Sequence, residues 1–315
     1  MTDGKIALIF PGQGSQIVGM GKELAEKFPL AKQTFEEADQ ALGYKLSQLC
    51  FEGPEDQLRM TEITQPAILT TSIAALRVLE TRIPKPAFVA GHSLGEYSAH
   101  VAAGTFSFAD AVRTVRNRGK YMQEAVPVGV GAMAAILGME LEKVAVVCQE
   151  AAQGEVCSPA NINSPEQVVI SGNTAAVERA AKLADERGAK RAKLLPVSAP
   201  FHCSLMKPAQ DRLEVDLTKL EMQKPVYPVA CNVEANLVTD DIRALQTLVR
   251  QVTGSVKWDP CMRLLVAQGV ETFIEVGPGK VLCGLMRQID RSKTCFNVAD
   301  EASLGKTLES LGGAA

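Results

Sequence analysis

Histidine is scarce in this sequence of 315 residues: it occurs three times, at positions 92, 100 and 202. Any chemistry that needs an imidazole therefore depends on one of these three side chains. The eight cysteines are scattered, and no two of them stand in a C-x-x-C pair. This spacing predicts neither a zinc site nor a disulfide framework, and it favours a reducing cytoplasm as the location.

Long apolar runs and a dominant charge of one sign are also missing. No apolar stretch reaches the ~18 residues that a membrane-spanning helix needs, and the first residues lead into a strand-like run rather than a signal peptide. The net charge of −3 predicts no general attraction to nucleic acid or to an anionic membrane. With these classes excluded, the sequence predicts an ordinary soluble globular protein, in agreement with its 46% hydrophobic and 22% charged residues.

A serine stands between two glycines in residues 91–95, Gly-His-Ser-Leu-Gly, which match the motif G-x-S-x-G. The apolar residues 86–90 before it suit a buried strand, and residues 96–103 after it suit a helix. Strand, G-x-S-x-G and helix together are typical of a nucleophile elbow, a sharp turn that exposes the serine hydroxyl. Glycines leave room for the reversal, and N–H groups at the helix start face the serine. The pattern predicts Ser93 as a catalytic nucleophile.

Strands and helices alternate through most of the chain, which predicts a parallel, doubly wound sheet in a large α/β-hydrolase-like domain. Residues 128–198 interrupt this alternation with the order β-α-β-β-α-β, which is typical of a ferredoxin-like α+β unit. We therefore expect a discontinuous large domain of residues 1–127 and 199–315, with a small subdomain of residues 128–198 inserted in it. A cleft between the two is the expected ligand site.

His202 is the candidate base for the serine. It follows Pro200 in a constrained loop, whereas His92 is held inside the elbow and His100 lies on the helix after it. A histidine that takes the serine proton would fit Ser93 for nucleophilic acyl transfer. The histidine needs an orienting group, which is either a neutral group or an acid between the two residues, although no acid there stands at a recognisable strand end. These acids include Asp110, Glu124, Glu166 and Asp185.

Four blocks of sequence, in this order, carry a family resemblance. They are residues 10–16 (FPGQGSQ), 91–99 (GHSLGEYSA), 199–203 (APFHC) and 275–282 (EVGPGKVL). Together they resemble the malonyl-CoA:acyl carrier protein transacylases, stand-alone enzymes of dissociated fatty-acid synthesis that are similar to the acyltransferase domains of polyketide synthases. The resemblance extends over residues 5–300. It implies the same α/β domain with a ferredoxin-like insert.

The resemblance implies catalytic roles for residues at matching positions. Ser93 would be acylated, and His202 would act as its base. The backbone N–H groups of Gln13 and Leu94 would form the oxyanion hole. Gln251 resembles the glutamine that helps to position the histidine, either by its side chain or by its main chain.

The resemblance also implies how the acyl group is chosen. Arg118, which is followed in its helix by a glycine and the apolar residues 121–122, would face inward and grip the malonyl carboxylate with its planar guanidinium. Phe201 would disfavour the extra methyl group of methylmalonyl. Met122 and Val281 complete the expected substrate contacts.

We therefore expect a ping-pong transfer of malonyl from malonyl-CoA to the phosphopantetheine thiol of acyl carrier protein. No cofactor or metal is expected, because the CoA thioester enters as a substrate. Acyl carrier proteins are acidic, and Lys190 and Arg191, in a basic run with Arg187 and Lys193, would dock the carrier. The chain is expected to act as a monomer in the cytoplasm.

Three other functions stay open at this point. A malonyltransferase of a polyketide pathway would carry the same motifs. A serine esterase or thioesterase shares the elbow, but it should have an identifiable acid and use water as the acceptor. A non-catalytic module that holds a CoA phosphate on the glycine turns would not need the hydroxyl of Ser93.

Overall fold

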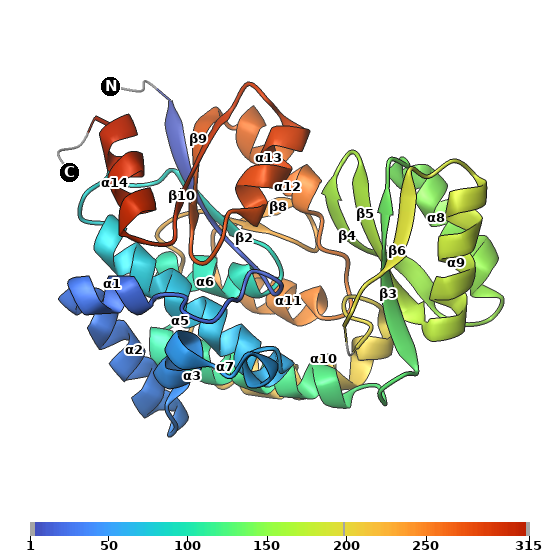
Figure 1. Cartoon of the computed structure of the whole chain (residues 1–315), viewed down its shortest axis with the longest axis horizontal. Coiled ribbons are helices and arrows are strands. Elements are labelled where there is room, and N and C mark those ends of the chain that lie inside the picture. The colour runs from blue at the N-terminus through green and yellow to red at the C-terminus, as the bar shows by residue number, and fades with distance from the viewer. Residues whose placement is uncertain (1–3, 198, 313–315) are drawn as a thin grey trace.

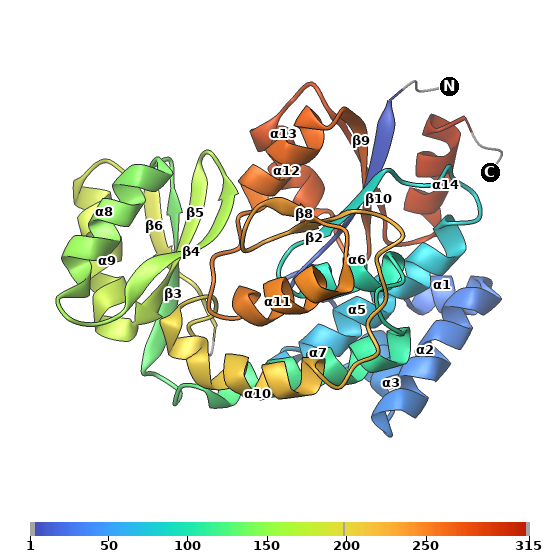
Figure 2. The same cartoon turned by 180° about the vertical axis from the view of Figure 1, so that it is seen from behind.

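Two β-sheets organise the protein, and a computed structural model describes residues 4–197 and 199–312. Figure 1 and Figure 2 both show the smaller sheet at one end of the molecule. The strands are β1 (Lys5–Phe10), β2 (Phe88–Gly91), β3 (Gly131–Leu137), β4 (Cys157–Ser164), β5 (Gln167–Asn173), β6 (Arg191–Leu194), β7 (Val229–Cys231), β8 (Asn236–Val238), β9 (Val270–Val276) and β10 (Thr294–Val298).

The helices pack on these sheets or on one another. They are α1 (Lys22–Lys27), α2 (Pro29–Leu42), α3 (Leu46–Glu52), α4 (Glu55–Leu58), α5 (Thr61–Leu79), α6 (Leu94–Ala102), α7 (Phe108–Glu124), α8 (Leu141–Ala152), α9 (Thr174–Glu186), the 3₁₀ helix η1 (Ser204–Met206), α10 (Lys207–Leu217), α11 (Asp241–Gln251), α12 (Trp258–Ala267), α13 (Val281–Ile289) and α14 (Glu301–Ser310).

The larger sheet has the strand order β10-β9-β1-β2-β7-β8. Its neighbours pair in parallel except for β7 and β8, so the parallel sheet is confirmed, with an antiparallel edge strand that the sequence did not predict. Successive residues of β1 face two different cores. Ile6 and Leu8 face the core that contains α5 and α6, whereas Ala7 and Ile9 face the core that contains α12 and α13. Helices thus cover both faces, as continuous apolar strands require.

The smaller sheet has the order β4-β5-β3-β6, and every pair in it is antiparallel. Its elements follow the chain order β-α-β-β-α-β, and apolar residues of α8 and α9, such as Val147 and Val177, pack on one face. The α/β fold with a ferredoxin-like unit is therefore confirmed. All four strands fall within residues 128–198, but the domain boundaries stay a prediction. Residue 198, residues 1–3 and residues 313–315 lie outside the described residues.

One disulfide corrects the prediction from the cysteine spacing. Cys283 on α13 and Cys295 on β10 are bonded, with 5.4 Å between their Cα atoms, because α13 packs against β10. The other six cysteines are free thiols. Within residues 4–197 and 199–312, no helix is long and apolar enough to cross a bilayer, and no group of three ligating side chains could hold a metal ion.

Candidate active site

Ser93 lies in the turn between β2 and α6, where the backbone is strained. Its φ of 51° and ψ of −104° are values that a residue with a side chain rarely adopts. The flanking glycines make the turn possible, since a Cβ on Gly91 would lie 1.9 Å from the carbonyl of Gly95. A Cβ on Gly95 would lie 2.1 Å from the carbonyl oxygen of Phe10. The strand, the sharp turn and the helix that the sequence predicts are all present.

His202 lies beside Ser93, in the loop before η1. Its Nε2 atom is 2.7 Å from Ser93 Oγ, and its Nδ1 atom is 2.9 Å from the main-chain carbonyl oxygen of Gln251. A carbonyl oxygen only accepts hydrogen bonds, so Nδ1 carries the proton and the lone pair of Nε2 faces the serine hydroxyl. Burial, followed by the positive charge of Arg118, lowers the pKa of His202 to about 3. The imidazole is therefore neutral and able to accept the serine proton.

Arg118 reaches the same serine from α7, and its side chain is buried. Nη2 donates hydrogen bonds to Ser93 Oγ at 3.0 Å and to Gln251 Oε1 at 2.9 Å. Nη1 donates to Gln65 Oε1 at 2.8 Å. Burial lowers the pKa of the guanidinium, but an arginine keeps its charge in proteins. Its hydrogen-bond acceptors in the described part of the chain are neutral oxygens, so a carboxylate would be a stronger partner than any of them.

The backbone N–H groups predicted for the oxyanion hole belong to Gln13 and Leu94. Leu94 is the first residue of α6, where an N–H group has no acceptor inside the helix. Gln13 lies in the loop after β1, and its side-chain Nε2 donates to Thr61 Oγ1 at 3.4 Å. Neither backbone N–H has an acceptor among the described residues. Both can therefore bind a negative charge that develops on a substrate oxygen.

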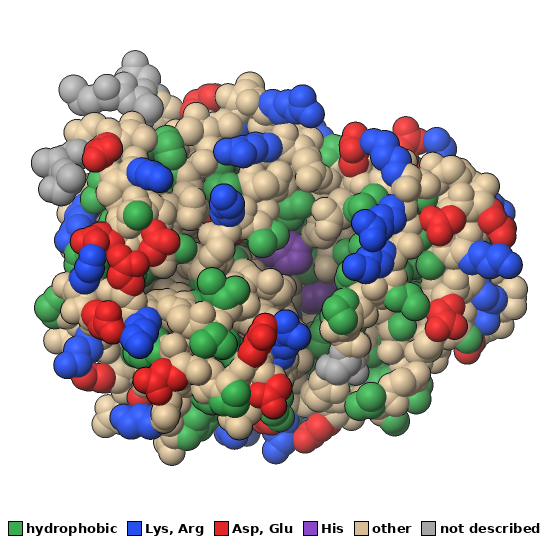
Figure 3. Space-filling view, in the orientation of Figure 1, with side chains coloured by type: hydrophobic (Ala, Val, Ile, Leu, Met, Phe, Trp, Pro, Cys, Tyr) green, Lys and Arg blue, Asp and Glu red, His purple; other side chains and the backbone are tan. Residues whose placement is uncertain are grey.

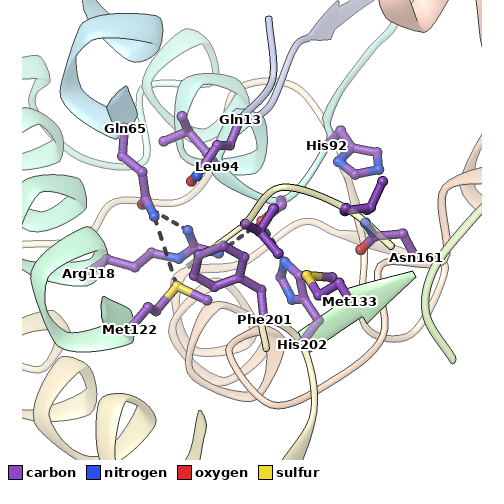
Figure 4. A pocket seen from close by; sticks show the side chains of 13 residues that line it. Gln13, Gln65, His92, Leu94, Arg118, Met122, Met133, Asn161, Phe201 and His202 are labelled. Carbon is purple, nitrogen blue, oxygen red and sulfur yellow. Dashed lines mark hydrogen bonds between the residues drawn. The ribbon is translucent and has the colours of Figure 1, made fainter. Parts of the chain in front are cut away.

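These groups meet in one pocket, and Figure 4 shows their side chains converging on it. Met122 and Phe201, two of the expected substrate contacts, line the pocket. Val281 is not among the lining residues: it is the first residue of α13 and is 54% exposed. Lys190 and Arg191 also lie outside the lining, exposed at the start of β6. The lining residues are Gln13, Gln65, His92, Ser93, Leu94, Arg118, Met122, Met133, Asn161, Leu195, Val197, Phe201 and His202.

Three residues to which the sequence analysis gave no role support these groups. Asn232, directly after β7, accepts a hydrogen bond from Ser93 N at 2.7 Å and donates to the Gly91 carbonyl at 2.8 Å. Gln65 in α5 accepts from the guanidinium, and Glu96 in α6 is buried. The end of a strand is the one signal that marks Asn232, because ligand sites of parallel sheets gather at the carboxyl ends of the strands.

Comparison with known proteins places the chain in a family. Residues 7–312 match the family described as acyl transferase domain. The malonyl CoA-acyl carrier protein transacylase of Escherichia coli K12 is 50% identical over 306 residues, which cover 97% of this chain and 99% of that protein. The corresponding Bacillus subtilis 168 protein is 49% identical over 308 residues, which cover 98% of this chain and 97% of that protein.

Solved structures give the same result. The acyl carrier protein S-malonyltransferase of Vibrio cholerae is 51% identical with a TM-score of 0.94, covering 96% of this chain and 99% of that one. A malonyl-transacylase in complex with its type II PKS acyl-carrier protein is 47% identical with a TM-score of 0.95, covering 97% and 99%. The chain belongs to the acyltransferase domain family, and within it to the malonyl CoA-acyl carrier protein transacylases.

Proposed function

We propose that this protein transfers the malonyl group from malonyl-CoA to the phosphopantetheine thiol of acyl carrier protein, through an ester on Ser93. One observation carries the proposal: Ser93 Oγ lies 2.7 Å from the basic nitrogen of His202 and 3.0 Å from the guanidinium of Arg118. A nucleophile beside both a base and a buried cation suits an acyl donor that carries its own carboxylate.

The first half-reaction forms the ester. Ser93 Oγ attacks the thioester carbonyl of malonyl-CoA while its proton passes to His202 Nε2. The N–H groups of Gln13 and Leu94 bind the oxyanion, and removing one such donor costs roughly 3–4 kcal/mol of transition-state stabilisation. The C–S bond then breaks, and the CoA sulfur leaves with the proton from His202.

The second half-reaction reverses these steps with another thiol. The carrier thiol gives its proton to His202 and attacks the ester carbonyl. The C–O bond to Ser93 breaks, and the serine oxygen takes the proton back. The protein is regenerated without a cofactor, and CoA takes part only as a substrate and product.

Side chains of the pocket wall are proposed to select the acyl group. We propose that the guanidinium of Arg118 binds the malonyl carboxylate, with Met122 and Phe201 beside the acyl chain. The ring of Phe201 should disfavour methylmalonyl, although a single contact of this kind is worth only about 1–3 kcal/mol. The exposed position of Val281 at the start of α13 suits contact with the CoA or carrier part rather than with the malonyl group.

Lys190 and Arg191 are proposed to dock the acidic carrier. They stand at the start of β6, and the chain runs from there to Leu195 and Val197 in the pocket wall. Figure 3 shows basic side chains gathered over β6, beside the hollow in which histidine side chains are visible. Lys190 pairs with Glu166 at 3.2 Å, but both side chains are exposed, so the pair binds weakly and can be exchanged for a carrier carboxylate.

Reversal of charge tests this docking surface. Lys190→Glu with Arg191→Glu should raise KM for the carrier and leave slow hydrolysis of malonyl-CoA unchanged. The matched control is Lys182→Glu on α9, where the lysine is 81% exposed and lies on a helix of the same small unit. An unchanged KM for the carrier, or an equal rise of KM in the control variant, would contradict docking of the carrier at Lys190 and Arg191.

We propose that the protein is located in the cytoplasm and that it is a monomer. Six free cysteines support a reducing compartment, whereas the bond between Cys283 and Cys295 runs against it. Cell fractionation and size-exclusion chromatography would test the two statements.

The reaction itself is tested by labelling. Wild-type protein and Ser93→Ala are incubated with labelled malonyl-CoA, and pantetheine-bearing carrier or buffer is then added. Label held by the wild type alone and discharged mainly by carrier supports transfer. Rapid release of malonate in buffer would instead indicate a thioesterase, and function that survives in Ser93→Ala would indicate a binding module. Carriers from fatty-acid and polyketide pathways, offered in parallel, distinguish the two malonyltransferase alternatives.

A further inference from the structure

Glu96 is a buried carboxylate that the steps above do not use. It lies in the first turn of α6, three residues after the nucleophile, with no exposed surface. Oε2 accepts hydrogen bonds from the backbone N–H of Asn232 at 3.0 Å and from Nε2 of Gln251 at 2.7 Å. Oε1 has no hydrogen-bond partner among the described residues. Such an anion is costly to bury unless a positive charge compensates it.

That positive charge is Arg118, and the side chain of Gln251 links the two. The amide donates from Nε2 to Glu96 Oε2 and accepts at Oε1 from Arg118 Nη2 at 2.9 Å. A reversed amide would set its NH₂ group against the guanidinium and its oxygen against the carboxylate, which is unfavourable at both ends. The hydrogen-bond acceptor at Glu96 Oε2 therefore fixes the amide, and the amide fixes the guanidinium.

The two charges also act on each other through space. Burial raises the pKa of Glu96 to about 7, and hydrogen bonds from Asn232 and Gln251, followed by the charge of Arg118, oppose that rise. Charges in such a site are screened less than they are in water. A second carboxylate bound by Arg118 beside Ser93 would be repelled by Glu96, whereas an acyl group without a carboxylate would not.

We propose that Glu96 is a positioning residue that sets how strongly the site prefers acyl groups bearing a carboxylate. Through Gln251 it holds the Arg118 guanidinium toward Ser93, and it partly offsets the positive charge there. The site then binds a carboxylate firmly enough to select it and weakly enough to release it to the acceptor. This inference rests on the proposed function, since it concerns the same acyl-enzyme.

Glu96→Gln separates the charge from the hydrogen bonds. The new amide oxygen can still accept from Asn232 and Gln251, so the geometry is kept while the negative charge is lost. We expect the ratio of Ser93 acylation rates for malonyl-CoA over acetyl-CoA to rise about tenfold, with a lower KM for malonyl-CoA. Glu96→Asp keeps the charge but draws the carboxylate back from Gln251, so it should loosen the hold on Arg118 and lower the ratio.

The outcomes are distinct. An unchanged or lower ratio in Glu96→Gln, or the same change of ratio in both variants, would overturn the inference. A wild-type protein that forms no malonyl ester would contradict the proposed function instead.

The wild-type protein offers a test that needs no variant. As pH falls from about 8 to about 6, Glu96 takes up a proton, and the malonyl-to-acetyl ratio should rise. The other groups that face Glu96 keep their charge over this range: Arg118 stays cationic, and burial raises the pKa of Tyr97, Cys231 and Cys261. Titration of the CoA part is common to both donors and cancels in the ratio. A ratio that stays flat would overturn the inference.

Discussion

The Nδ1 atom of His202 lies 2.9 Å from the main-chain carbonyl oxygen of Gln251. The carbonyl oxygen takes the place beside Nδ1 that an acid occupies in a serine hydrolase. The carbonyl fixes the tautomer and the ring orientation, but it brings no negative charge to stabilise an imidazolium. It also explains why no acid between Ser93 and His202 stands at a suitable strand end. The side chain of Gln251 is left to bind Ser93 O, Glu96 and Arg118.

The first prediction concerns the separate roles of the main chain and the side chain of Gln251. Gln251→Ala keeps the carbonyl, so acyl transfer should fall far less than the ~10⁴-fold loss that follows when the acid of a Ser-His-Asp triad is changed. Stability should fall by about 1–3 kcal/mol, because buried oxygens of Glu96 and Ser93 lose a donor. Stopped-flow acylation and urea denaturation measure the two effects. A loss of activity near 10⁴-fold would show that the side chain, not the main chain, orients the histidine.

The second prediction concerns Arg118. Arg118→Ala should lower acylation by malonyl-CoA by a factor that corresponds to about 2–5 kcal/mol, the usual cost of truncating one partner of a buried charge pair. Acylation by acetyl-CoA should survive or rise. Arg118→Lys should recover only part of the malonyl activity, because an ammonium cannot bind a carboxylate bidentately. The control is Arg113→Ala on the exposed side of the same helix. Equal loss with both donors would contradict the assigned role.

The third prediction concerns the pH profile of the base. Because the pKa of His202 is lowered to about 3, kcat/KM for acetyl-CoA should stay flat from about pH 8 to about pH 5, with no fall near the ordinary value of 6.5. The charge of Arg118 is the second cause of that shift, so Arg118→Ala should move the acidic fall of the profile to higher pH. Circular dichroism at each pH checks that the protein stays folded. A wild-type midpoint near 6.5 would be inconsistent with this geometry.

The fourth prediction concerns stability. Glu275, buried at the end of β9, accepts from the backbone N–H groups of Leu282 and Cys283, yet burial raises its pKa from 4.5 to about 7. The folded state therefore binds a proton that the unfolded state has lost. This contribution to stability is full below pH 4.5 and disappears as pH rises through about 7.

Glu275→Gln measures the size of this effect. Relative to the wild type, the variant should gain up to about 3 kcal/mol of unfolding free energy between pH 4.5 and pH 8. Urea denaturation at both pH values gives the difference, in which the titration of all other groups cancels. A difference that does not change with pH, or that changes in the opposite direction, would show that the carboxylate is not titrating in this range.

Local pattern was sufficient for the elbow and for most of the elements, but not for the three-residue edge strand β8. Apolar runs mark the other strands of the larger sheet, and the order of elements in residues 128–198 identifies the ferredoxin-like unit, since both depend on neighbours in sequence. The glycines at 91 and 95 mark the turn because a Cβ at either position would collide with backbone. The elbow motif pointed to Ser93, the shortage of histidines to His202 and the family resemblance to the role of Arg118, and the structure brings these three together.

Contacts between distant parts of the chain decided the rest. Whether Gln251 acts by its main chain or its side chain depends on how α11 packs against the His202 loop, 49 residues away. The hydrogen bond from Ser93 N to Asn232 spans 139 residues, and it exists because β7 lies next to β2 in the sheet. The bond between Cys283 and Cys295 likewise needs α13 folded onto β10. Composition and spacing do not predict these contacts. The contacts form only when packed helices and strands bring residues that are remote in sequence within hydrogen-bond or covalent distance.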